Sequence, residues 1–121
     1  MKNSNESIFI VDDDQGILDS FDAILGDDYN LVMVNDGNKA IELLDKEKPR
    51  LLFLDIKMPG QNGLEVLKNI RKKGISTVVV IVTALVQDTY QDIARRYSIY
   101  RYLNKPLDVD EVEDIARRVL N

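Results

Sequence analysis

Short apolar runs alternate with longer amphipathic segments along this chain. Three of the runs are unbroken and rich in Val, Ile or Leu, which is typical of parallel strands that are buried on both faces. The spacing predicts five strands, at Ile8–Val11, Leu31–Val34, Leu51–Leu54, Val78–Val82 and Tyr100–Leu103.

Each of these runs is followed by apolar residues at helical spacing. Repeats at i, i+3, i+4 and i+7 place apolar side chains on one face of a helix, which can then pack against a sheet. A strand followed by a helix, repeated five times, predicts an α/β fold with a doubly wound parallel sheet, right-handed crossovers and helices on both faces. The five stripes are Ile17, Leu18, Phe21, Ile24 and Leu25; Ala40, Ile41 and Leu44; Leu64, Leu67 and Ile70; Tyr90, Ile93, Ala94 and Tyr97; and Val109, Val112, Ile115, Ala116 and Val119.

The 121 residues are enough for one ordinary domain with its own core, and we expect a single domain over residues 1–121 with a frayed end at 1–6. The chain contains 0 His and 0 Cys. These absences exclude a disulfide framework, thiolate or imidazole metal sites, a cysteine nucleophile and a Ser-His-Asp triad. The remaining chemistry must use carboxylates, hydroxyls, lysine and cations with oxygen ligands, such as Mg²⁺.

Charge and hydropathy narrow the class of partner. The net charge of −5 argues against nucleic acid as a partner of the whole surface. No apolar run exceeds five residues, so we expect no membrane span, and the first residues lack the apolar stretch of a signal peptide. A cytoplasmic location is the default expectation.

Charged residues near predicted helix ends are first interpreted as structural. Asp14 is a plausible N-cap of the first helix, and Asp108 or Asp110 of the last. Cations in the last turn of a helix complement its dipole and solvate the surface, and a basic nucleic-acid patch is the lesser alternative. This interpretation covers Arg71-Lys72-Lys73, Arg95-Arg96 and Arg117-Arg118.

The polar residues that follow the strands form the candidate site. Ligands of open α/β sheets bind at the carboxyl ends of the strands, and in the order 2-1-3-4-5 the first and third strands are neighbours. Asp12 and Asp13 would then share a crevice with Asp55. Clustered carboxylates repel one another, so the crevice needs a divalent cation or an ammonium group, which Lys105 can supply. Thr83 adds a hydroxyl on the same rim.

Four motifs at these strand ends make the chain resemble the receiver domain of the two-component response-regulator family over essentially its whole length. Each motif is modest alone, and all four in order at the family's spacing are highly specific. The resemblance implies a flavodoxin-like three-layer sandwich. The motifs are Ile8-Phe9-Ile10-Val11-Asp12-Asp13-Asp14; Leu54-Asp55-Ile56-Lys57-Met58-Pro59-Gly60-Gln61-Asn62-Gly63; Val82-Thr83-Ala84; and Tyr102-Leu103-Asn104-Lys105-Pro106.

The first two motifs carry the family's acceptor and metal positions. Asp55 matches the aspartate that is phosphorylated. Asp12 and Asp13 match the acidic pair that holds Mg²⁺, together with the Asp55 carboxylate and the backbone carbonyl of Lys57. Mn²⁺ is expected to be able to substitute.

The last two motifs carry the family's switch positions. Thr83 matches the switch hydroxyl, Tyr102 the aromatic switch residue and Lys105 the lysine that pairs with the phosphoryl group. In the family the peptide bond before the matching proline is usually cis, so a cis Lys105–Pro106 bond is expected.

The resemblance therefore implies a phospho-acceptor switch and not a turnover enzyme. The donor would be a histidine kinase or a histidine phosphotransfer protein, because the chain has no histidine of its own. Phosphorylation would reshape the face formed by the fourth helix, fifth strand and fifth helix, which would control a downstream protein or a fused output domain.

Two stretches depart from the family pattern. Lys57 lies two residues past the acceptor, at the mouth of the site, where it would steer phosphate or screen attacking water. Ser98 stands where relatives often have the glycine that ends a helix, so a distorted helix end is expected. Tyr97 and Tyr100 join Tyr102 on the presumed output face, where they either pack locally or bind a partner.

Three rival interpretations share parts of this pattern. A haloacid-dehalogenase-like phosphatase needs an Asp two residues past its nucleophile, and Lys57 occupies that position. A flavodoxin-like or dinucleotide-binding module shares the architecture, but the sequence has neither Gly-x-Gly-x-x-Gly nor a Walker A motif. A pseudo-receiver that only binds partners would not need the complete acceptor set.

Overall fold

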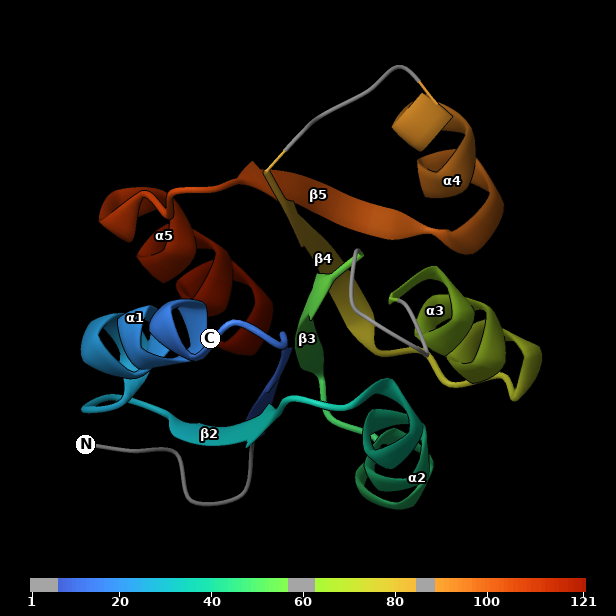
Figure 1. Cartoon of the computed structure of the whole chain (residues 1–121), viewed down its shortest axis with the longest axis horizontal. Coiled ribbons are helices and arrows are strands. Elements are labelled where there is room, and N and C mark those ends of the chain that lie inside the picture. Colours follow the sequence, from blue (N-terminus) through green and yellow to red (C-terminus); the bar gives the residue numbers. More distant parts are fainter. Residues whose placement is uncertain (1–6, 57–62, 85–88) are drawn as a thin grey trace.

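The computed structural model describes residues 7–56, 63–84 and 89–121. Strands and helices alternate along these residues (Figure 1). The bounds of the strands lie within one residue of the predicted runs at either end. The strands are β1 (Ser7–Val11), β2 (Asn30–Val34), β3 (Leu51–Asp55), β4 (Val78–Thr83) and β5 (Ile99–Asn104); the helices are α1 (Gln15–Leu25), α2 (Gly37–Glu47), α3 (Gly63–Lys72), α4 (Thr89–Tyr97) and α5 (Val109–Leu120).

The strands form one parallel sheet in the order β2-β1-β3-β4-β5, as predicted. Register places Val11 beside both Val34 of β2 and Leu54 of β3. β1, β3 and β4 are almost entirely buried, whereas the edge strands β2 and β5 are only partly buried. Unbroken apolar runs therefore identified the strands that are covered on both faces.

Helices cover both faces of the sheet and give three layers (Figure 1). Helices α1 and α5 lie on one face, and α2, α3 and α4 on the other. Residues of each strand alternate between the two faces, so β1 contributes Phe9 to one core cluster and Ile10 to the other. The residues described include no helix that is long and apolar enough to cross a membrane.

Aspartate side chains begin several of the helices. Asp14 caps α1 by accepting a hydrogen bond from Gly16 N at 2.9 Å, and Asp108 caps α5 by accepting one from Glu111 N at 3.1 Å. Both positions were among those predicted. Asp36 caps α2 in the same way, accepting from Asn38 N at 2.8 Å and Lys39 N at 3.1 Å. The signal for this third cap was present in the sequence, because Asp36 lies four residues before the apolar helical stripe that begins at Ala40.

Two apolar residues are more exposed than the stripes and runs suggest. Val109 is 51% exposed, because it opens α5 in the turn that precedes the part of the helix packed on the sheet. Tyr100 is 45% exposed. The β4–β5 register passes from Val79–Ile99 to Val80–Arg101, so Tyr100 is an extra residue in a bulge without a partner on β4. A bulge re-aims a side chain, and here it turns the Tyr100 ring outward, where Arg101 lies 5.6 Å from its centroid.

Helix α4 ends at a residue in the left-handed backbone region. Ser98 follows the helix with φ 58° and is exposed. The predicted irregularity at this point is therefore a left-handed serine at a position that glycine adopts without steric cost.

Replacing Ser98 with Gly is expected to stabilise the protein by about 0.5–1 kcal/mol, since relief of the left-handed strain outweighs the added freedom of the unfolded chain. Urea unfolding measures the change. Ser98→Ala is the matched control, because it removes the same hydroxyl but keeps the Cβ, and it should give no gain. Equal stability of the Gly and Ala variants would contradict the prediction.

Candidate functional site

Three carboxylates meet at the carboxyl ends of β1 and β3. Asp12 and Asp13 follow β1, and Asp55 is the last residue of β3. One carboxylate oxygen from each of the three lies within 4.8 Å of the others. Asp12 and Asp55 are 1% and 5% exposed, while Asp13 is open to solvent. The juxtaposition predicted from the strand order is therefore present.

Backbone contacts fix the position of Asp12. Its N–H donates to Val34 O at 3.0 Å, which extends the β1–β2 pairing by one residue. Its Oδ1 accepts a hydrogen bond from Asp14 N at 2.9 Å. The turn that begins α1 thus holds one oxygen of this carboxylate and leaves the other, Oδ2, directed at Lys105.

Lys105 brings an ammonium group to the carboxylates from the other side. Its backbone N–H donates to Thr83 O at 2.8 Å, which anchors the residue to the end of β4. Its Nζ lies 3.0 Å from Asp12 Oδ2 and 3.5 Å from Asp55 Oδ2. Burial alone would lower the pKa of Lys105, but the contact with Asp12 and the charges of Asp12 and Asp55 raise it above its ordinary value. The predicted cis bond joins Lys105 to Pro106.

The carboxylate set suits a hard divalent cation. Three carboxylates face one ammonium, so the cluster retains net negative charge. Asp12 Oδ2 is buried and accepts no hydrogen bond from the described residues, although Lys105 Nζ lies 3.0 Å away as its ion-pair partner. An oxygen that keeps acceptor capacity in a buried acidic cleft is the kind of ligand that Mg²⁺ takes. The cluster could therefore hold a metal ion.

The two predicted switch residues lie on the strands beside this cluster. Thr83 is the last residue of β4 and is 2% exposed. Tyr102 of β5 is partly buried and packs against the core cluster on the α2–α3–α4 face. Tyr97 packs against the same cluster, so two of the three tyrosines have the local packing that was one of the two interpretations. The switch roles of Thr83 and Tyr102 stay predictions.

Lys57 and the rest of the stretch 57–62 lie outside the described residues, as does the stretch 1–6. The metal-ligand role of the Lys57 carbonyl and the role of its side chain at the mouth of the site therefore stay predictions.

Gly63 is a site residue for which sequence reasoning gave no role. It begins α3, and its N–H donates to Ile56 O at 3.2 Å. A Cβ at this position would collide with the carbonyl oxygen of Asp55 and would lie only 2.7 Å from Ile56 Cα. The start of α3 therefore rests directly on the backbone that carries Asp55. The glycine stood in a quoted motif, but the reason for it is a through-space approach that no spacing reveals.

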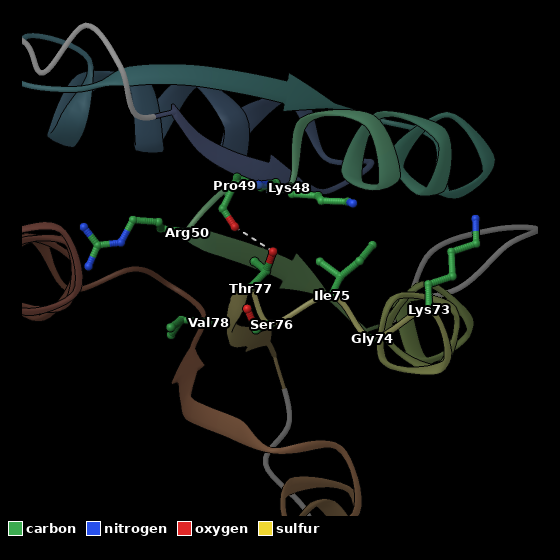
Figure 2. A pocket seen from close by; sticks show the side chains of 9 residues that line it. All are labelled: Lys48, Pro49, Arg50, Lys73, Gly74, Ile75, Ser76, Thr77 and Val78. Atoms are coloured by element: carbon green, nitrogen blue, oxygen red, sulfur yellow. Dashed lines mark hydrogen bonds between the residues drawn. The ribbon is translucent and has the colours of Figure 1, made fainter.

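A hollow of about 310 Å³ lies at the opposite, amino-terminal edge of the sheet, among the segments that lead into β3 and β4 (Figure 2). Thr77 lies in it with its hydroxyl donating to Pro49 O at 2.6 Å, while the Arg50 and Lys73 side chains extend away. Arg50 reaches Val119 O at 2.8 Å and Lys73 pairs with Asp45 at 3.5 Å. This hollow is separate from the carboxylate cluster and contains none of the predicted site residues.

Fold and site together define a doubly wound α/β protein with a carboxylate–lysine centre at its topological switch point. Residues 8–117 match the family model described as "Response regulator receiver domain". The chain is 31% identical over 117 residues to sporulation initiation phosphotransferase F of Bacillus subtilis, which covers 96% of this chain and 94% of that protein. It is 34% identical over 118 residues to the transcriptional regulatory protein CrdR of Helicobacter pylori, covering 96% of this chain and 55% of the relative.

A solved structure of a LuxR-family DNA-binding response regulator from Staphylococcus aureus superposes with a TM-score of 0.83 at 28% identity, covering 96% of this chain and 99% of that one. The chain therefore belongs to the response-regulator receiver-domain family. Receiver domains are phospho-acceptor switches of two-component signalling, and this chain is one of them.

Proposed function

We propose that Asp55 accepts the phosphoryl group and that Asp12, Asp13 and Lys105 complete its reaction centre. The observation that carries this proposal is the convergence of the three carboxylates within 4.8 Å, with Lys105 Nζ 3.0 Å from Asp12 and 3.5 Å from Asp55. Asp55 is buried at the end of a central strand, so its backbone is rigid and its carboxylate is held in place. A weak nucleophile such as a carboxylate depends on this kind of positioning.

In the transfer, a carboxylate oxygen of Asp55 forms a bond to phosphorus while the bond between phosphorus and the donor's leaving group breaks. The product is an acyl phosphate, and the leaving group of the donor keeps the electron pair of the bond that breaks. Asp12, Asp13, Asp55 and the backbone carbonyl of Lys57 would hold Mg²⁺, for which Mn²⁺ could substitute. When bound, the ion would supply positive charge against the phosphoryl oxygens. Lys105 supplies a second, fixed positive charge, because a lysine ammonium beside carboxylates is protonated at neutral pH.

The phosphorylated state would be read out at the face made of α4, β5 and α5. The Thr83 hydroxyl would bond a phosphoryl oxygen, and Tyr102 would fill the space that this movement leaves. Thr83 lies on β4, next to the strand β3 that carries Asp55, and Tyr102 lies on β5, one strand further along the sheet. The protein would catalyse its own phosphorylation and slow dephosphorylation and would not turn over a substrate.

The donor would be a histidine kinase or a histidine phosphotransfer protein in the cytoplasm, because the chain holds 0 His. The output would be a downstream protein or a fused domain, since this chain spans only 55% of one relative and 24% of another, the transcriptional regulator NtrC of Salmonella typhimurium. We place the whole chain, residues 1–121, in a single receiver domain, in which the family match covers 8–117.

The test is incubation with a small phosphodonor and Mg²⁺, followed by intact-mass measurement. A gain of one phosphoryl group that requires the cation is expected. A steady release of phosphate from many monoesters would instead identify a phosphatase. No gain in mass, together with no Mg²⁺-dependent rise in Tm, would leave a partner-binding pseudo-receiver.

Lys105→Ala is expected to leave phosphorylation detectable and to blunt the switch. Removing the ammonium leaves Asp12 Oδ2 and Asp55 facing each other without their cation, which should destabilise the metal-free protein by about 1–3 kcal/mol. Urea unfolding with and without Mg²⁺ measures this loss, and added Mg²⁺ should recover part of it. The phosphorylation-dependent change in amide hydrogen exchange of β5 should fall below half of its wild-type size.

Lys68→Ala is the matched control for that variant, because Lys68 is an exposed lysine of α3 whose partner is Glu65 at 3.8 Å. It should behave as wild type in both measurements. An undiminished phosphorylation-dependent change in Lys105→Ala would remove the switch role given to Lys105.

A further inference from the structure

Arg71, near the carboxyl end of α3, reaches across to the end of α4. Its Nε donates to Tyr97 O at 2.8 Å and its Nη2 to Ser98 O at 3.3 Å, while its Nη1 donates to Ile75 O at 2.7 Å in the α3–β4 connection. The guanidinium therefore joins three backbone carbonyls from two segments. Arg71 lies in the last turn of α3, as predicted, but its guanidinium also reaches the end of α4, which the sequence did not indicate.

The carbonyls that Arg71 contacts are ones that need a donor. The last carbonyls of a helix have no partner within the helix, and a cation at this end also interacts favourably with the negative end of the helix dipole. Burial lowers the pKa of Arg71, but a guanidinium remains charged at neutral pH. Its planar fork can serve several acceptors at once, which a lysine ammonium cannot do with the same geometry.

The described side chains of helix α4 are less buried than those of the other helices. Helices α1, α2, α3 and α5 each bury three or four residues. In the described side chains of α4, Asp92 to Tyr97, none is fully buried. The connection that follows is irregular as well, with left-handed Ser98 and the bulge at Tyr100. A helical segment with little buried apolar surface has a low local stability, so the two charge-assisted hydrogen bonds from Arg71 to Tyr97 O and Ser98 O are a large share of what fixes the carboxyl end of α4.

The other end of α3 rests on the acceptor segment. Gly63, its first residue, donates to Ile56 O at 3.2 Å and lies directly against the Asp55 backbone. Helix α3 thus connects the backbone of Asp55 at one end to the last carbonyls of α4 at the other. This connection lies on the α2–α3–α4 face of the sheet.

We propose that Arg71 is a positioning residue that holds the carboxyl end of α4 and the start of β5 against α3, and that α3 carries a displacement at Asp55 to the output face through it. The second half of this proposal rests on the proposed phosphorylation of Asp55. Arg71, Ser98 and Tyr100 also line one hollow of about 460 Å³, so a shorter side chain at 71 enlarges an existing hollow and does not empty a packed core.

The test compares full-length Arg71→Met, Arg71→Lys and Lys72→Met by peptide-resolved amide hydrogen exchange, before and after treatment with a small phosphodonor and Mg²⁺. Lys72 is the matched control because it is the exposed neighbour on the same helix. In the unphosphorylated protein, exchange over residues 98–100 should rise roughly tenfold or more in Arg71→Met, less in Arg71→Lys and not at all in Lys72→Met. Exchange of β1 should stay unchanged in all three, which shows that they fold.

The rate at which Arg71→Met incorporates the phosphoryl group should lie within about twofold of the wild-type rate, because Arg71 does not touch the reacting groups. Its phosphorylation-dependent change in exchange over 98–100 should fall below half of the wild-type change. Wild-type exchange over 98–100 in Arg71→Met would overturn the positioning role. A full phosphorylation-dependent change in that variant would overturn the transmission through α3. If wild type gains no mass, the proposed function fails, and the unphosphorylated comparison still decides the positioning role.

Discussion

Asp55→Asn is expected to abolish phosphoryl incorporation, with no mass gain from a small phosphodonor and Mg²⁺ under conditions in which the wild type gains one phosphoryl group. An amide oxygen is a far poorer nucleophile than a carboxylate oxygen. Asp55 is the buried last residue of a central strand, and its Oδ2 lies 3.5 Å from Lys105 Nζ. Asp12 shares the burial but already contacts Lys105 at 3.0 Å and Asp14 N at 2.9 Å.

The same variant should fold at least as well as the wild type. Asn has the size of Asp, and the substitution removes one of three carboxylates that lie within 4.8 Å of one another around a single ammonium. Relief of like-charge repulsion at a reaction centre is a common source of stability in inactive variants. Thermal unfolding without Mg²⁺ measures it, and a fall in Tm would contradict the expectation.

Asp45→Asn is the control for this variant. Asp45 is exposed on α2 and pairs with Lys73 at 3.5 Å, at the edge of the sheet away from the cluster. The control should gain mass as the wild type does. A mass gain in Asp55→Asn would move the acceptor role to Asp12 or Asp13.

The alternation of strands and helices was readable from the sequence because hydrophobic burial imposes it. Central strands need apolar side chains on both faces, so Leu51–Leu54 is recognisable without knowledge of the fold. Once the strand order is given, chemistry at the strand ends follows from topology, and Asp12, Asp13 and Asp55 meet for that reason. Caps such as Asp14 are equally local, because an N-cap contacts backbone only two or three residues away.

Features that depend on contacts distant in the sequence could not be read in this way. The sequence placed Lys105 near the carboxylates but could not tell that its Nζ lies closer to Asp12 than to Asp55. The sequence suggested only a surface role for Arg71. Its acceptors, Tyr97 O and Ser98 O, are backbone atoms, and the residue types at these positions do not indicate that they accept hydrogen bonds from Arg71. The bulge that exposes Tyr100 is likewise a property of strand pairing, which the pattern of apolar residues does not predict.

The close approach at Gly63 gives the second large effect. Gly63→Ala is expected to destabilise the protein by about 3 kcal/mol, at the upper end of the cost of overpacking. The added Cβ would meet the Asp55 carbonyl oxygen, Asp55 C at 2.8 Å and Ile56 Cα at 2.7 Å. All three are backbone atoms, so no side chain can rotate away, and either α3 or the end of β3 must move.

Because β3 is held by pairing to β1 and β4, most of the movement should fall on α3, with a smaller shift at Asp55, the last residue of the strand. Even a small displacement of a reacting group slows a reaction, so we expect phosphoryl incorporation at least tenfold slower in the folded fraction. Urea unfolding and timed mass measurements report the two effects separately.

Gly74→Ala, at the other end of α3, separates overlap from backbone strain. Gly74 has φ 75°, and nothing lies within 4 Å of where its Cβ would be, so alanine there is strained but meets no atom. It should lose about 1–2 kcal/mol and phosphorylate at the wild-type rate, because the strain is far from Asp55. Gly63→Ala brings overlap without left-handed strain and Gly74→Ala brings left-handed strain without overlap, so the two losses report the two effects separately, and the loss in Gly63→Ala should be the larger. If the two variants lose equal stability and phosphorylate equally fast, the start of α3 does not constrain Asp55. The proposed transmission from Asp55 through α3 would then be contradicted at its first step.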